Sequence, residues 1–140
     1  MTKVFFYHGA SDKIAAACAL IAGAWAKRKP ILVYAPDRAV ADGVDRLLWT
    51  RDQLSFVPHC RADSPLAAET PILIADRLDG IAQDERLMNL SNEVPRAYER
   101  FQSLIEVVGQ EESERLAARE RVRYYKEQGC EVSYFDLKDR

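Results

Sequence analysis

The sequence lacks the features that mark several common classes of protein. It has three cysteines, an odd number, and no CxxC pair, which argues against a disulfide-stabilised secreted domain and favours a reducing cytosol. No apolar run approaches the roughly 20 residues of a membrane helix, and the apolar N-terminal stretch is too short for a signal peptide. A formal net charge of −2 argues against wholesale binding of nucleic acid. The expectation is a globular protein without a membrane partner.

Glycine is also scarce, with six in the whole chain. A phosphate-binding loop needs glycines, because backbone N–H groups must close around the anion. The first connection, HGASDK, contains one glycine and matches neither GxGxxG nor GxxxxGK[ST]. Asp12 would repel a phosphate at the start of the helix that follows. The sequence therefore predicts no phosphate-binding loop.

The sequence does contain a regular alternation of strand-like and helix-like patterns. Short apolar runs bounded by turn residues predict strands, and apolar residues at helical spacing predict helices, with Asp37 and either Ser11 or Asp12 as N-caps and Gly129 as a stop. We expect a single α/β domain over residues 1–140, a Rossmann-like layered fold with a mainly parallel central sheet flanked by helices. The predicted strands are 3–8, 31–35, 71–76, 86–91, 103–109 and 130–137, and the predicted helices are 11–29, 36–50 and 110–129.

Residues able to carry catalytic chemistry are scattered along the chain. His8 ends the first predicted strand, where α/β enzymes often place functional groups. A Cys–His dyad would need His8 beside Cys60, and nothing in the sequence predicts that proximity. The two histidines and three cysteines have no metal-ligand spacing. We expect no catalytic residue, metal or cofactor, and keep a small nucleotide-binding or Cys/His-dependent α/β enzyme, using His8 or Cys60, as the alternative.

The last predicted helix carries a row of cations. Arg115, Arg119 and Arg123 recur at i, i+4 and i+8, and Val122 and Lys126 fall in the same sector at about 100° per residue. Such a row is either a solvated charged face or one wall of a groove for an acidic, partly apolar peptide, in which arginine pairs with carboxylates. The residues of the neighbouring sector that we expect to face the core are Leu116, Ala117 and Tyr124.

The stretch LLWTRDQLSFVPHC, residues 47–60, places two large aromatics and a histidine around one connection. Trp49 and Phe56 are either anchors of an interface or part of the core, and the stretch could also be an active-site loop. Pro58 fixes the backbone, and we expect His59 to order the connection by hydrogen bonding.

The segments LLWTRDQLSFVPH and ERLAARERVRYYKEQG together resemble the chi subunit family of the bacterial DNA polymerase III holoenzyme, over nearly the whole chain. The resemblance implies a non-catalytic replication adaptor. It would link the clamp-loader complex, through the psi subunit, to the acidic C-terminal tail of single-stranded DNA-binding protein. It also implies a cytoplasmic place in the replisome, only indirect contact with DNA, and a monomer when the protein is alone.

The resemblance also assigns two sites. The family pattern can have tyrosine where this sequence has Val122, so the shape of the tail pocket should differ here. The implied tail-binding residues are Val108, Arg115, Arg119, Val122 and Arg123, and the implied psi-binding residues are Trp49 and Phe56.

Overall fold

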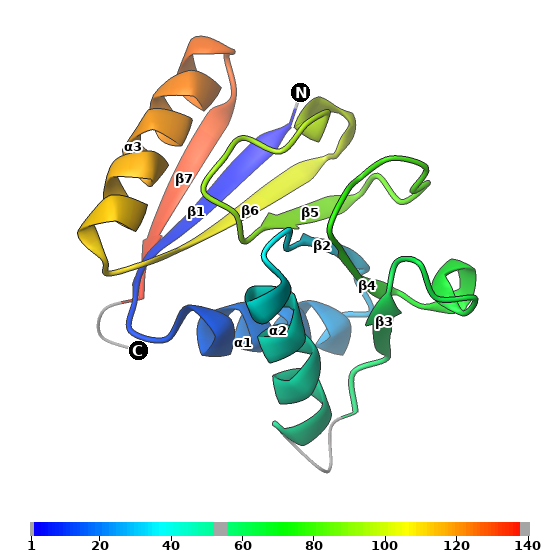
Figure 1. Cartoon of the computed structure of the whole chain (residues 1–140). Helices are drawn as coiled ribbons and strands as arrows, with labels where there is room; N and C mark the ends of the chain where they lie inside the picture. Colours follow the sequence, from blue (N-terminus) through cyan, green and yellow to red (C-terminus); the bar gives the residue numbers. More distant parts are fainter. Residues whose placement is uncertain (1, 52–55, 138–140) are drawn as a thin grey trace.

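The structure is a computed structural model that describes residues 2–51 and 56–137. The described residues form one seven-stranded, fully parallel sheet with the order β3-β4-β2-β5-β6-β1-β7, together with three α-helices (Figure 1). The elements in chain order are β1 Lys3–Ala10, α1 Lys13–Ala26, β2 Ile31–Tyr34, α2 Arg38–Thr50, β3 His59–Arg61, β4 Ile72–Ala75, β5 Arg86–Asn89, β6 Ser103–Gly109, α3 Glu112–Glu127 and β7 Glu131–Asp136, with short 3-10 turns at Ala67–Glu69 and Tyr98–Arg100.

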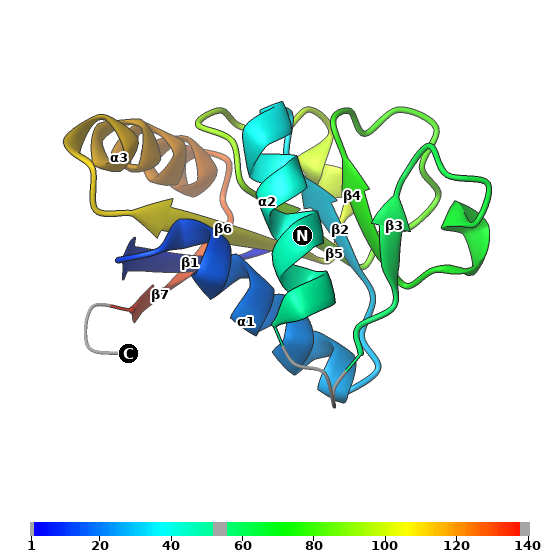
Figure 2. The same cartoon turned by 60° about the horizontal axis from the view of Figure 1, so that its bottom comes forward.

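The sheet separates two apolar layers. Helices α1 and α2 lie against one face and α3 against the other, as Figures 1 and 2 show. Successive side chains of a strand point to opposite faces, so Ile31 and Val33 of β2 pack into the α1–α2 layer while Leu32 packs into the other. Strands buried on both faces read as continuous apolar runs, which is why β2 and β4 were predictable from the sequence.

The predicted layered α/β fold with a parallel sheet is confirmed. Asp12 caps α1 by accepting a hydrogen bond from the Ala15 N–H at 3.0 Å, and Asp37 caps α2 by accepting one from Ala39 at 2.9 Å. Gly129 has φ +84°, the left-handed conformation that glycine adopts at low cost after a helix end. Among the described residues, no helix has the length and apolar character to cross a bilayer.

Two expectations about local structure were wrong or incomplete. The connection around His59 contains a strand, β3, which pairs with β4 at the edge of the sheet; three residues are too few to show a strand pattern. In α3 the expected core residues face outward, since Leu116 is 51% and Tyr124 37% exposed, and Ala117 is only half-buried. The buried residues of the helix are Ala118, Arg121 and Tyr125.

Candidate functional site

The orientation of α3 is set by a charge beneath it. Glu106 of β6 is fully buried, and its carboxylate accepts hydrogen bonds from Arg121 Nε and Nη2 at 3.2 and 3.1 Å. The Tyr125 hydroxyl donates to it at 2.6 Å, and the Asn89 amide donates at 3.0 Å. Burial and the nearby Glu106 carboxylate raise the pKa of Tyr125 well above its ordinary range. Because these donors share one acceptor on the sheet, the helix is held in one rotation.

The start of α3 is fixed by a second carboxylate. Glu114 Oε1 accepts a hydrogen bond from the Gly109 N–H at 2.9 Å and lies 2.8 Å from Lys13 Nζ of α1. Burial alone would raise the pKa of Glu114, but the bonds from Lys13 and Gly109 outweigh it and hold the pKa below its ordinary value. The end of β6 and the starts of α1 and α3 are thereby tied together.

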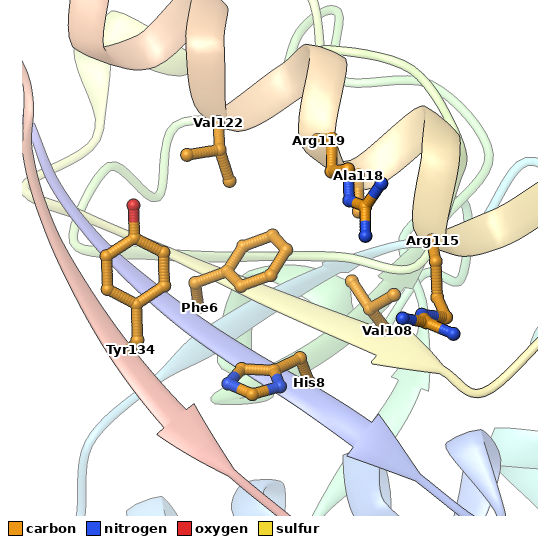
Figure 3. A pocket seen from close by; sticks show the side chains of 8 residues that line it. All are labelled: Phe6, His8, Val108, Arg115, Ala118, Arg119, Val122 and Tyr134. Carbon is orange, nitrogen blue, oxygen red and sulfur yellow. The ribbon is translucent and has the colours of Figure 1, made fainter. Parts of the chain in front are cut away.

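A groove of about 330 Å³ opens between this helix and the sheet (Figure 3). Its floor is apolar, with Phe6 of β1 and Val108 of β6 both nearly fully buried. Tyr134 of β7 closes one end and packs edge-on against Phe6, with ring centroids 6.0 Å apart. Val122 lies above that end, and the groove is therefore shaped to accept an apolar side chain.

The guanidinium groups stand at the other end of the groove. Arg115 and Arg119 line it and reach from α3 toward Val108 (Figure 3). Neither has an ion-pair partner within the described part of the chain. Arg123 does not line the groove; it is 68% exposed and lies 3.6 Å from Glu120. The predicted cation row is therefore split, with two arginines over the groove and one outside it.

Four lining residues did not belong to the predicted site: Phe6, His8, Ala118 and Tyr134. Phe6 and His8 lie two apart on β1 and so share a face of the sheet, a signal that the sequence contained. Tyr134 could not be placed there without the strand order, because β7 pairs with β1 rather than with β6.

The aromatic pair lies on a different part of the molecule. Trp49 at the end of α2 is 58% exposed and Phe56 is 55% exposed, and their ring centroids are 5.3 Å apart. These values exclude the interpretation of either ring as a core residue. Residues 52–55 of the same stretch lie outside the described residues.

His59 hydrogen-bonds within its own connection, as the sequence predicted, and its ring also lies against the aromatic pair. Its ring lies 5.0 Å from the Trp49 ring, and its Nδ1 hydrogen-bonds the Val57 carbonyl at 2.7 Å. Its Nε2 lies 3.2 Å from Asp45 Oδ1 without forming a hydrogen bond to it. Trp49 and Phe56 therefore form an exposed aromatic surface that packs on His59, a buried and hydrogen-bonded residue.

The candidate catalytic residues are not brought together. His8 lies on β1 and Cys60 on β3, with four strands between them in the sheet order. At about 4.8 Å per strand they are roughly 24 Å apart, so no Cys–His dyad forms. Burial raises the pKa of Cys18 to about 11, which keeps that thiol protonated. Among the described residues, no group of three or more His, Cys, Asp or Glu side chains is placed to hold a metal ion.

The fold and the groove define a class of protein. Its members have a Rossmann-like α/β fold with a single glycine in the first turn, and a cationic groove over an apolar floor. Within that class, the chain belongs to the DNA polymerase III chi subunit, HolC, family, whose model matches residues 1–133.

The relatives cover most of the chain. It is 31% identical to the DNA polymerase III subunit chi of Pseudomonas aeruginosa over 133 residues, 92% of each chain. It is 31% identical to the protein of that name from Haemophilus influenzae over 118 residues, 84% of this chain and 82% of the relative. The Escherichia coli subunit chi is 28% identical over 117 residues, 83% of this chain and 80% of the relative.

Proposed function

We propose that this protein is a non-catalytic adaptor of the DNA polymerase III holoenzyme, acting as one chi-like domain over residues 1–140. The groove beneath α3 binds the acidic C-terminal tail of single-stranded DNA-binding protein. The Trp49–Phe56 surface binds psi, or another protein in its place, and so joins the clamp-loader complex. DNA is contacted only through these partners, and no cofactor takes part.

The proposal that the groove binds the acidic tail rests on one observation. Two guanidinium groups, which have no ion-pair partner in the described part of the chain, lie over an apolar floor. Guanidinium groups pair with carboxylates in a bidentate geometry that is shorter and stronger than a neutral hydrogen bond. Phe6, Val108 and Val122 offer contact to an apolar terminal side chain. An acidic peptide with an apolar C-terminal residue matches both halves of the groove.

The second half of the proposal rests on the aromatic pair. Large exposed aromatics with a well-packed base are the residues that most often dominate the energy of a protein interface. Trp49 and Phe56 both expose more than half of their surface while contacting each other and His59. The surface therefore has the composition of an interface anchor.

The test is calorimetric titration with a synthetic peptide in which a run of aspartates precedes a C-terminal phenylalanine with a free carboxylate. Arg119→Ala should weaken binding by about 1.5–3 kcal/mol, because it removes a charged hydrogen bond over an apolar floor. Affinity for the unchanged protein should fall as salt is added.

Arg77→Ala is the matched control, because that side chain is 78% exposed and lies on the connection after β4. It should leave the affinity unchanged. Equal affinities of Arg119→Ala and the unchanged protein would remove the groove from the proposal.

A further inference from the structure

We infer that Lys126, and not Arg123, is the third cation of the peptide site, beside Tyr134 and just outside the groove lining, and that it fixes the direction in which an acidic peptide lies there. The inference rests on the proposed function of the groove and adds a specificity-determining residue to it. The peptide's terminal carboxylate lies at Arg115 and Arg119, and the acidic residues before it run out past Tyr134 to Lys126.

The geometry of α3 separates the two cations. At about 100° per residue, and with Arg115 set at zero, the groove-lining residues Ala118, Val122 and Arg119 lie at roughly −60°, −20° and +40°. Lys126 lies at about +20°, inside this sector, whereas Arg123 lies at about +80°, outside it.

The contacts of the two cations agree with their angular positions. Lys126 Nζ lies 5.3 Å from the centroid of the Tyr134 ring, the ring that closes the apolar end of the groove. No ion pair is found for Lys126 in the described part of the chain, whereas Arg123 is paired with Glu120. An ammonium held over an aromatic face keeps its remaining N–H groups available for carboxylates.

Beyond the arginines, the opposite end of the groove carries acidic side chains of the protein itself. There the groove adjoins a second hollow, which shares His8 and Arg115 with it and is also lined by Asp136. The first turn of α3 adds Glu112 and Glu114, the latter paired with Lys13. A peptide that left the groove on this side would pass Glu112 and Asp136, whereas one that left on the Tyr134 side would pass Lys126.

The experiment compares Lys126→Ala with Arg123→Ala, which removes an exposed cation from the same helix. Each is titrated with the aspartate-run peptide ending in phenylalanine, and with a second peptide in which asparagines replace the aspartates. Lys126→Ala should weaken the aspartate peptide by about two- to fivefold, the range for an exposed ion pair, and should leave the asparagine peptide unchanged. Arg123→Ala should change neither peptide.

Lys126→Ala affinities equal to those of the unchanged protein, or a larger effect of Arg123→Ala than of Lys126→Ala, would overturn the inference. Arg119→Ala is run in parallel to keep the two claims separate. If Arg119→Ala weakens both peptides while Lys126→Ala has no effect, the groove still binds the tail and only the assignment of Lys126 is wrong. If no protein binds either peptide, the proposed function itself fails.

Discussion

At the scale of single residues, the most consequential pair is Glu106 and Arg121, neither of which is among the residues that line the groove. Both are almost completely buried, with 0% and 3% of the side chain exposed. Arg121 Nη1 is buried and has no hydrogen-bond partner among the described residues. A buried ion pair contributes little net stability over an apolar pair, but removing one partner leaves an uncompensated charge. The pair therefore fixes the helix's position more than it stabilises the fold.

Arg121→Met should lower the free energy of unfolding by about 3–5 kcal/mol, because Glu106 then remains charged in the interior. The double variant Glu106→Gln with Arg121→Met should be more stable than Arg121→Met alone, since a neutral amide can still accept from Tyr125. Urea denaturation followed by circular dichroism measures both. A double variant no more stable than the single variant would show that packing, and not charge, holds the helix.

At the scale of elements, α3 shows what the sequence can and cannot predict. The helix and its stop at Gly129 were predictable, because helical spacing and a glycine after the last turn are local signals. Its rotation was not, since apolarity favours Leu116 and Tyr124 as core residues, while the buried residues include Arg121. Arg121 is buried because it pairs with the Glu106 carboxylate on β6, and no local pattern in the helix sequence indicates that partner.

The sheet shows the same division. The apolar strands β1, β2, β4 and β6 were predictable from their composition, whereas the edge strand β3 was too short to recognise. The strand order places β1 between β6 and β7, which brings Phe6 and Tyr134 into the groove. Of the groove residues, Arg115, Arg119 and Val122 could be inferred from helical spacing, Val108 was implied by the family resemblance, and Tyr134 required the strand order.

Glu114 connects α3 to β6 and α1 through its bonds to Gly109 and Lys13, and this gives a prediction of how stability depends on pH. Since the pKa of Glu114 is held below its ordinary value of 4.5, its contribution to stability is present above that value and is lost as pH falls through the lowered pKa. Glu114→Gln should lower the free energy of unfolding by about 1 kcal/mol at pH 7, and the difference should vanish in strong acid. Thermal unfolding across the acid range measures it.

Glu112→Gln is the matched control for this prediction. Glu112 is exposed in the same first turn of α3, so it interacts with the helix dipole. The ion pair with Lys13 and the hydrogen bond from Gly109 are made by Glu114. Its loss should be smaller than that of Glu114→Gln. Equal losses, or a difference that persists at low pH, would show that the ion pair does not stabilise the fold.

At the scale of the whole molecule, the two surfaces belong to different parts of the fold. The groove lies between α3 and the β6-β1-β7 side of the sheet. The aromatic surface lies at the end of α2, beside β3 at the opposite edge of the sheet (Figure 1). They share no residue, and strands β4, β2 and β5 lie between them in the sheet order. The proposed adaptor role needs this separation, because it requires two partners to bind at once.

Separate surfaces predict independent effects of substitution. Trp49→Ala should weaken a psi-like partner by roughly 2 kcal/mol or more if the ring is an interface anchor, and should leave the affinity for the acidic peptide unchanged. Because Trp49 is 58% exposed, the loss of stability should stay within about 0.5 kcal/mol.

The double variant with Arg119→Ala should show the sum of the two single effects in each titration, as expected for distant sites with no shared contacts. Calorimetry with each partner, alone and with the other present at saturation, measures this. A loss of peptide affinity in Trp49→Ala would mean that the sheet couples the two surfaces, and a large drop in melting temperature would mean that the ring supports the fold after all.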